Sequence, residues 1–442
     1  GETPTDLKPK TSLVSAERSL LPPPGKILSI QGVEEARKIK GVKEIILMKE
    51  AGDMAEEPRS NLGKVGYVIT VGKTREEAIR INDLAREILK IEIGASNDLT
   101  WDIIRNNARK KFYIACKACV VCDGLECAGK VPGIGGIGTG SSFTENLTAL
   151  ARYQINLRTI HEVKIPDTSV ELFGHKLALP VLGAPITGME TNLAGGMDER
   201  EYADAILDGC LECGTLGMVG DGASPKKYLI GLEAIKKRGG LGIPIFKPRE
   251  YNLDIIKRFK AAEDAGAIAV GIDIDAASFK TMTLKGQAVG PKTIQELQEL
   301  KSHLKIPFIL KGIMNVESAL AAIEAGADAI VVSNHGGRVM DHMPGTAEVL
   351  PEITNAVGGR IKVLVDGGIR EGTDILKMLA LGADAVMIGR PVCIAAFGAG
   401  QEGVSFYLRE KLNELKKAMI LTGCGSIGRI DPSVIFRKKG ER

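Results

Sequence analysis

The chain has 442 residues, of which 44% are hydrophobic and 26% charged, and its 58 basic and 55 acidic side chains leave a formal net charge of +3. This length allows two or three domains, and the near balance of charge gives no reason to expect binding to nucleic acid or to a membrane surface. No apolar run is long enough to span a bilayer, and residues 1–10 are polar, unlike a signal peptide. Eight cysteines in a chain of this size favour free thiols or metal ligands over a disulfide framework, so we expect a cytoplasmic protein.

The first 93 residues predict a tail followed by a small domain. Residues 1–19 are predicted to be the tail, and a Pro-Pro-Pro-Gly run then marks the start of an α/β domain over residues 20–93. Thr74 and Glu77 form a capping-box pattern at the start of its second helix. In chain order we expect a strand and turn at 25–33, a helix at 34–40, strands at 43–48 and 66–71, and a helix at 74–89.

Residues 94–145 are predicted to be a linker, and they contain four closely spaced cysteines: Cys116, Cys119, Cys122 and Cys127. Their spacing is close to the bacterial ferredoxin run C-x2-C-x2-C-x3-C-P, with one residue more and no adjacent proline. Such a set could hold a [4Fe–4S] cluster or zinc, although two consecutive C-x2-C steps would strain a single zinc site. The alternative is a redox-sensitive or structural group of thiols.

From residue 146 to 442 short apolar runs alternate with amphipathic segments, which is the pattern of a (β/α)8 TIM barrel. A doubly wound open sheet is the alternative, but eight evenly spaced units favour the barrel. The eight predicted strands are 181–184, 215–219, 243–246, 268–272, 307–310, 329–333, 362–366 and 385–388.

Polar residues follow several of these runs, at the end of the barrel where active sites form. His335 is one of five histidines, and with Arg338 it offers a proton acceptor and a cation for an anionic substrate group. Asp273 could orient the imidazole and Lys311 could stabilise an oxyanion or a reduced ring. The glycines and arginines of residues 366–370 and 389–390 predict a phosphate site. Taken singly, each has a structural explanation, such as a buried histidine, a tight turn or a surface arginine.

The chain from 145 to 440 resembles the FMN-dependent α-hydroxy-acid oxidases and dehydrogenases, which include glycolate oxidase, lactate oxidase and flavocytochrome b2. The motifs that carry the resemblance are Ile309-Leu310-Lys311-Gly312, Ser333-Asn334-His335-Gly336-Gly337-Arg338, Leu350-Pro351-Glu352, Val365-Asp366-Gly367-Gly368-Ile369-Arg370-Glu371-Gly372 and Ile388-Gly389-Arg390-Pro391. The resemblance implies a barrel with FMN across its mouth.

The resemblance also implies a role for each matching residue. His335 would take the substrate proton with support from Asp273, Arg338 would bind the substrate carboxylate, and Lys311 would lie near flavin N1 and C2=O. The remaining positions would contact the cofactor: Ala184 and Pro185 beside the ring, Ser333 at the ring or ribityl chain, Asp366 at the ribityl hydroxyls, and Gly368, Arg370, Gly389 and Arg390 at the phosphate.

Three departures affect the substrate side. A glycine-rich run at 133–140 stands where the family has a substrate-binding tyrosine, and residues 244–246 followed by Lys247 replace its Gln-x-Tyr. Residues 276–279 replace its second substrate arginine. Lys247 could supply the lost cation, but we expect an exposed lysine.

The small domain resembles the C-terminal lobe of ATP-grasp carboxylate–amine ligases over residues 18–93. The resemblance rests on Pro22-Pro23-Pro24-Gly25, Gly41-Val42, Gly52-Asp53, Gly66-Tyr67-Val68-Ile69 and Gly72-x-Thr74-x-Glu76-Glu77-Ala78. The nucleotide- and metal-binding lobes of those ligases are missing, so we expect a docking module or a fusion remnant rather than a ligase.

We therefore expect an FMN-dependent oxidoreductase that dehydrogenates a 2-hydroxy acid or a related CH–OH substrate. The cysteines and the altered pocket favour an electron-acceptor protein over oxygen, and a metal cluster would give the reduced flavin a one-electron outlet. The family resemblance suggests a homo-oligomer, either a tetramer or an octamer. The alternatives are an FMN-dependent isomerase, like type 2 isopentenyl-diphosphate isomerase, and a flavin electron-transfer or partner subunit of a ligase complex.

Overall fold

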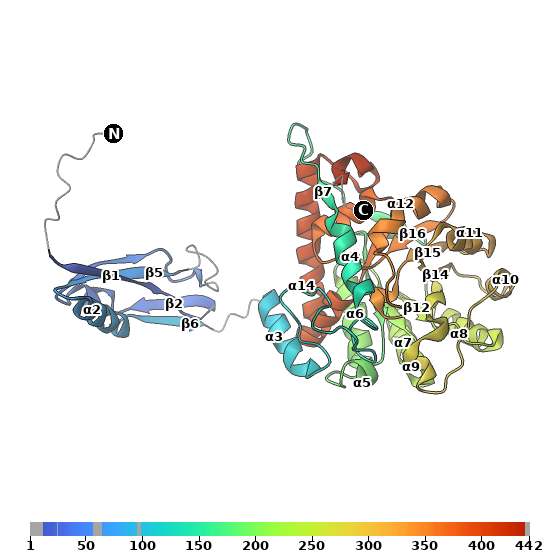
Figure 1. The fold of residues 1–442 in the computed structure, drawn as a ribbon, viewed down its shortest axis with the longest axis horizontal. Helices are drawn as coiled ribbons and strands as arrows, with labels where there is room; N and C mark the ends of the chain where they lie inside the picture. The colour runs from blue at the N-terminus through green and yellow to red at the C-terminus, as the bar shows by residue number, and fades with distance from the viewer. Residues whose placement is uncertain (1–11, 24, 56–63, 95–98, 438–442) are drawn as a thin grey trace. The chain divides into compact units, whose positions relative to one another are not determined.

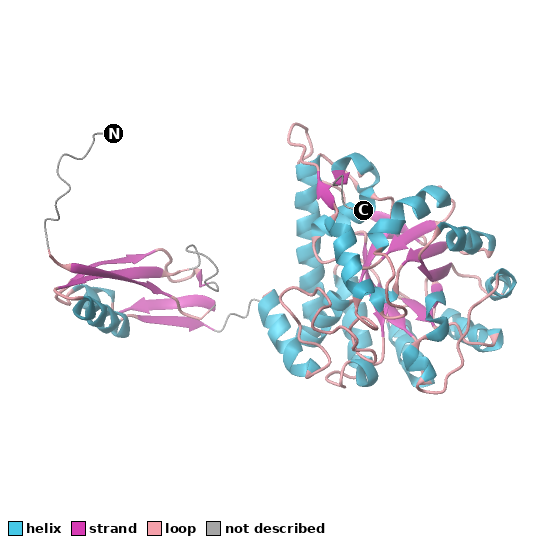
Figure 2. Cartoon of the chain, in the orientation of Figure 1, coloured by secondary structure: helices cyan, strands magenta, loops and turns pink. Residues whose placement is uncertain are grey.

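The computed structural model describes residues 12–23, 25–55, 64–94 and 99–437. The chain divides into two compact units, residues 1–99 and 100–442 (Figures 1 and 2). Within the described ranges, no helix combines the length and the apolar character needed to cross a membrane.

The N-terminal unit contains two three-stranded antiparallel sheets, ordered β1-β5-β3 and β4-β2-β6. Its core combines residues of both sheets with the apolar side of the longer helix, including Ile27, Ile45, Val68 and Ala85. The elements are β1 (Val14–Leu20), β2 (Gly25–Gln31), α1 (Val33–Arg37), β3 (Val42–Leu47), β4 (Met54–Ala55), β5 (Gly66–Gly72), α2 (Arg75–Ile88) and β6 (Lys90–Gly94).

The predicted tail and the predicted capping box of this unit both differ from expectation. Residues 14–19, assigned above to a tail, form strand β1 together with Leu20 and pair with β5, while residues 1–11 lie outside the described part. The strand is mostly exposed at the sheet edge, so its sequence lacks the apolar alternation that marks a half-buried strand. At the start of α2, Thr74 Oγ accepts from the Glu77 N–H as predicted, but the Glu77 carboxylate accepts from Lys73 rather than from Thr74.

The C-terminal unit is a closed (β/α)8 barrel of eight parallel strands, so the open-sheet alternative is wrong. Closure is direct, because Val181 at the start of the first strand pairs with Val386 in the last. The strands are β10 (Val181–Ile186), β11 (Gly217–Gly220), β12 (Ile243–Phe246), β13 (Val270–Asp273), β14 (Phe308–Ile313), β15 (Ala329–Val332), β16 (Lys362–Val365) and β17 (Ala385–Ile388).

Helices and short strands surround this barrel (Figure 1). The helices are α3 (Trp101–Phe112), α4 (Ser141–Ala151), α5 (Met189–Asn192), α6 (Glu199–Glu212), α7 (Pro225–Lys237), α8 (Asn252–Asp264), α9 (Lys280–Thr283), α10 (Ile294–Ser302), α11 (Val316–Glu324), α12 (Thr346–Val357), α13 (Gly372–Ala380) and α14 (Arg390–Thr422). The short strands are β7 (Tyr153–Ile155), β8 (Val170–Leu172), β9 (His175–Leu177) and β18 (Ile435–Arg437).

Helix α4 is fixed to the loop that follows β15 by a pair of buried amides. Asn146 Nδ2 donates to Asn334 Oδ1 at 2.9 Å, and Asn334 Nδ2 donates to Asn146 Oδ1 at 3.1 Å. Because buried amides are costly unless they are hydrogen-bonded, this reciprocal pair strongly favours one placement of the loop. The next residue in the loop is His335.

Candidate active site

A cavity of about 280 Å³ opens at the carboxyl ends of the barrel strands. The structure brings nearly all the predicted site residues to its wall: Ala184, Pro185, Asp273, Lys311, His335, Arg338, Asp366, Gly368, Arg370, Gly389 and Arg390. Ser333 is the exception. It is fully buried beneath the wall, where its hydroxyl accepts from the His335 N–H at 3.0 Å.

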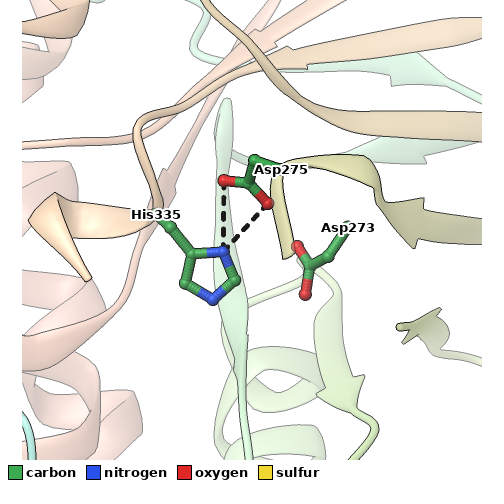
Figure 3. A group of neighbouring side chains, drawn as sticks. All are labelled: Asp273, Asp275 and His335. Atoms are coloured by element: carbon green, nitrogen blue, oxygen red, sulfur yellow. Dashed lines mark hydrogen bonds and ion pairs between the residues drawn. The ribbon is translucent and has the colours of Figure 1, made fainter. Parts of the chain in front are cut away.

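His335 enters the cavity directly after β15, with a positive φ of 56°. Its Nδ1 lies 3.0 and 3.2 Å from the two carboxylate oxygens of Asp275, and its Nε2 points away from that carboxylate (Figure 3). Burial lowers the pKa of His335 to about 4, although the Asp275 charge opposes the shift. The imidazole is therefore neutral near pH 7, with Nδ1–H donating to Asp275 and the Nε2 lone pair free to accept a proton.

The carboxylate bonded to His335 is Asp275, not Asp273 as the sequence suggested. Strand β13 ends at Asp273, and the 3-10 segment Ile274–Ser278 then turns Asp275 toward the imidazole. Gly312 makes room for it, since a Cβ at that position would lie 2.5 Å from the Asp275 side chain.

Asp273 instead joins two lysines in a buried charge cluster. Its carboxylate lies 2.7 Å from Lys247 Nζ and 3.0 Å from Lys311 Nζ, and Lys311 also lies 3.9 Å from Asp366. Burial alone would raise the pKa of Asp273, but the two ammonium groups outweigh it and hold that pKa far below its usual range. Burial likewise opposes the charge on Lys311, yet Asp273 raises the net pKa of that lysine. The expectation of an exposed Lys247 is wrong, because the residue is only 5% exposed.

Asp273, Asp275 and His335 place ligand atoms within 4.8 Å of one another, which is close enough for a metal ion. The two ammonium groups already neutralise Asp273, and an added cation would lie beside them. The charges therefore favour a proton-transfer group here rather than a metal site.

Arg338 lies in the loop after β15 and is held by neutral partners. Its guanidinium donates to Gly133 O at 2.9 Å and to Asn192 Oδ1 at 3.2 Å, and it lies 5.2 Å from the centre of the Phe279 ring. Burial lowers its pKa to about 10, so the group keeps its charge at neutral pH. Its Nε has no hydrogen-bond partner in the structure, which leaves a buried donor for an anionic ligand.

The loops after β16 and β17 form the basic end of the cavity. Gly367 and Gly368 have positive φ values and lie directly against Asn146, where a Cβ on either would meet it at under 3 Å. Arg390 stacks 3.9 Å from the centre of the Phe143 ring and donates to Ile134 O at 2.7 Å. Arg370 Nε and Asp366 Oδ1 are buried without a partner.

These groups fit FMN. The unpaired Arg370 donor and the adjacent Arg390 suit a phosphate, the unpaired Asp366 oxygen suits a ribityl hydroxyl, and Lys311 suits the ring edge that gains negative charge on reduction. Buried polar atoms without partners are uncommon in folded proteins, and a ligand with complementary groups would satisfy them.

The four cysteines of the linker lie outside this cavity but next to it. They line a second, smaller cavity, and Ile134 and Arg390 belong to the walls of both. In the structure this segment belongs to the same compact unit as the barrel.

Sequence reasoning missed three residues of the site: Asp275, Phe279 and Asn192. Phe279 packs 5.0 Å from the His335 ring, centre to centre, within the segment 276–279 that replaces the family's second substrate arginine. The only sequence signal for Asp275 is the Asp-x-Asp spacing at the end of β13. Asn192 carries no sequence signal, since α5 is a single short turn.

Comparison with known proteins gives two matches along the chain. Residues 134–295 and 277–437 match the family model described as FMN-dependent dehydrogenase, and residues 18–94 match that of L-amino acid ligase C-terminal domain 2. A 4-hydroxymandelate oxidase from Amycolatopsis orientalis is 34% identical over 333 residues, which cover 66% of this chain and 89% of the relative. An L-lactate oxidase from Lactobacillus jensenii is 32% identical over 65% of this chain and 76% of the relative.

Solved structures similar to this chain agree with the family match. A mandelate oxidase variant with a monooxide FMN adduct superposes with a TM-score of 0.58 at 34% identity, covering 72% of this chain and 100% of the other. A second mandelate oxidase variant, with 2-hydroxy-phenylacetamide, gives a TM-score of 0.61 at 30% identity over 78% and 100% of the two chains. The chain is an FMN-dependent oxidoreductase and belongs to the FMN-dependent dehydrogenase family.

Proposed function

We propose that this protein oxidises a 2-hydroxy acid to the corresponding 2-oxo acid. One observation carries the proposal: His335, held by Asp275 through Nδ1, and the cation Arg338 line the same cavity. A base and a fixed guanidinium three residues apart suit a substrate in which CH–OH adjoins a carboxylate. The names of the relatives, which include oxidases of 4-hydroxymandelate and lactate, support this substrate class.

Each residue is proposed to act through its own chemistry. His335 Nε2 takes the substrate proton, and Asp275 stabilises the imidazolium that forms. Arg338 holds the carboxylate, with Asn192 fixing the guanidinium. When bound, FMN supplies the acceptor for the two electrons. FMN would be held by residues that line the cavity: Ala184 and Pro185 beside the ring, Lys311 at its edge, Asp366 at the ribityl chain, and Gly368, Arg370, Gly389 and Arg390 at the phosphate.

The substrate side favours an apolar substituent on the hydroxy acid. Phe279 contacts both the His335 ring and the Arg338 guanidinium, where a second carboxylate-binding arginine would add charge. Lys247 does not replace that arginine, since Asp273 neutralises it. A single guanidinium and an aromatic wall suit a monocarboxylate with a hydrocarbon side chain.

Anaerobic mixing of the FMN-loaded protein with a panel of 2-hydroxy acids tests the proposal. We expect substrate-dependent loss of the oxidised flavin absorbance, fastest with apolar side chains and slowest with dicarboxylates. If no 2-hydroxy acid reduces the flavin while dithionite does, the proposed substrate class is wrong.

We propose an electron-acceptor protein rather than oxygen as the partner, and a metal centre, [4Fe–4S] or zinc, on Cys116, Cys119, Cys122 and Cys127. The support is the position of these thiols beside the flavin cavity. Measuring hydrogen peroxide during aerobic turnover tests the acceptor. Stoichiometric peroxide would make the protein an oxidase.

We also propose a cytoplasmic homo-oligomer, a tetramer or octamer. None of the eight cysteines forms a disulfide in the structure, which is compatible with a reducing compartment. Leu157, Ile160 and Ile165 are exposed in one loop, which is a common feature of subunit contacts. Light scattering of the full chain tests the assembly, and a monomer at micromolar concentration would contradict it.

A further inference from the structure

We propose that Cys116, Cys119, Cys122 and Cys127 bind a [4Fe–4S] cluster, rather than zinc, and that this cluster is the electron outlet of the flavin site. The inference rests on the proposed function for the source of its electrons, but the metal site itself stands on the geometry of the cysteine segment.

The four thiols converge on one space. All four line the same small cavity and are half-buried. Cys210, Cys213, Cys393 and Cys424 lie elsewhere and do not line it. Convergence of four thiols from a twelve-residue stretch is the ligand arrangement that metal centres require.

The spacing of the sulfurs favours a cluster over a single ion. Tetrahedral zinc, with Zn–S bonds of about 2.3 Å, would bring the sulfurs within roughly 3.8 Å of one another. Across the described ranges, the only three potential ligands within 4.8 Å of one another are those of Asp273, Asp275 and His335. No three of the cysteine sulfurs are therefore that close, whereas a four-iron cluster, being much larger than one ion, needs its thiolates farther apart.

The segment is a fixed framework rather than a free loop. Gly135 packs so closely on it that a Cβ there would lie 1.8 Å from Cys127 O, and Gly124 packs on the Phe143 ring. Arg109 donates to Lys117 O at 2.8 Å and to Ala118 O at 3.2 Å. Ligands held by the surrounding protein bind a metal centre with less ordering cost.

The charges around the cavity suit an anionic centre. Arg370 donates to Cys122 O at 3.2 Å and lies 3.7 Å from its Sγ, and Arg390 forms part of the cavity wall. Four thiolates on a cluster carry net negative charge, which buried guanidinium groups stabilise.

The same wall connects the thiols to the flavin site. Ile134 and Arg390 face both cavities, and Gly133 accepts from the substrate-side Arg338 while Gly135 contacts Cys127. Oxidation of each CH–OH group releases two electrons and two protons. The cluster accepts the electrons from the flavin one at a time and passes each to an external one-electron carrier protein, and the protons go to solvent.

The outer side of the segment offers a surface for such a carrier. Tyr113, Ile114, Val120, Val121 and Leu125 are all exposed around the cysteines. Lys110, Lys111 and Lys130 are also exposed nearby. An apolar patch with a basic rim suits an acidic carrier protein.

Metal analysis of the full chain, loaded with FMN and purified anaerobically, tests the site without reference to activity. We expect roughly four iron atoms and as many acid-labile sulfides per chain, and a paramagnetic signal after dithionite reduction. Cys119→Ser and Cys122→Ser should lose the iron and retain FMN, whereas the matched control Cys213→Ser should retain both. Zinc in place of iron, or iron loss in the control alone, would overturn the proposal, as would the absence of any metal after reconstitution with ferrous iron and sulfide.

Anaerobic addition of a 2-hydroxy acid tests the electron route. We expect the flavin absorbance to fall and the paramagnetic signal of the reduced cluster to appear, and FMN-free protein should give no signal. Flavin reduction without the cluster signal would overturn the proposal that the cluster accepts electrons from the flavin. No flavin reduction, with the iron content intact, would count against the proposed function and leave the metal site standing.

Discussion

The two sides of the barrel cavity differ in how their charges are used. After β15, β16 and β17, His335 Nε2, Arg370 Nε and Asp366 Oδ1 remain available to a ligand. After β12 and β13, the charged groups of Lys247 and Asp273 neutralise each other, and Phe279 fills the space beside them. The first side offers unpartnered groups to a cofactor and a proton, whereas the second presents charges that are already paired, with Phe279 beside them.

This contrast explains why the family is readily identified while the substrate is not. Residues of the first side must match a cofactor of fixed shape, so they keep recognisable motifs. On the second side Lys247 and Asp273 pair with each other rather than with a ligand, so their residue types do not indicate a substrate.

The largest expected effect is on the first side, at His335. His335→Gln keeps the size of the side chain but removes the proton acceptor, so the rate of flavin reduction by substrate should fall by about 10²–10⁴-fold. FMN affinity, measured by fluorescence titration, should stay within a few-fold of the parent. A parental rate of reduction in this variant would show that His335 is not the base.

The buried charge cluster should show a large effect on stability. Lys311→Met removes one of the two cations beside Asp273, and we expect a loss of about 3 kcal/mol in the free energy of unfolding. Trp101 is the only tryptophan and lies in the barrel unit, so its fluorescence in urea reports this unit. Because the pKa of Asp273 is lowered by folding, its contribution is present above its unfolded pKa of about 3.9 and lost at lower pH.

The matched control for that variant is Lys362→Met. Lys362 pairs with Asp384 at 2.8 Å, nearly the same distance, but its side chain is 46% exposed. Water screens such a pair, so the loss should be under about 1 kcal/mol. Equal losses in the two variants would mean that burial of the Asp273 cluster has no energetic consequence.

Replacing Asp275 and Asp273 in turn by asparagine separates the roles of the two aspartates. Asp275→Asn should lower kcat/KM by about 10²-fold, since the imidazole loses the group that orients it. It should also move the acid limb of the pH profile below the parental pKa of about 4, because the Asp275 charge raises that pKa. Asp273→Asn should chiefly reduce stability. If the acid limb shifted more in Asp273→Asn than in Asp275→Asn, Asp273 rather than Asp275 would be the partner of His335.

The smallest expected effect is at Phe279, on the second side of the cavity. Phe279→Leu keeps an apolar side chain but loses the ring contacts with His335 and Arg338. We expect KM for an aromatic 2-hydroxy acid to rise by up to about tenfold with little change in kcat. A hundredfold fall in kcat would instead place Phe279 among the groups that position the base.

The sequence predicted the barrel because each strand is a compact apolar run, and it placed His335 and Arg338 correctly at the cavity. It could not assign the partner of His335, since the chain leaves strand geometry between Asp273 and Asp275 and the alternation of faces ends there. It also missed the burial of Lys247, whose partner lies 26 residues away on the next strand. Edge strand β1 was missed because a mostly exposed strand has no apolar pattern.

The amide pair between Asn146 and Asn334 has a consequence for how this protein can vary. Each side-chain amide both donates a hydrogen bond to the other and accepts one from it. Neither a carboxylate nor a hydrocarbon side chain can do both. Replacing one asparagine would leave the buried amide of the other without its hydrogen-bond partner. A single substitution at either position is therefore expected to be destabilising. The pair therefore makes residue choice in α4 depend on residue choice in the loop that carries His335, although 188 residues separate the two asparagines in the chain.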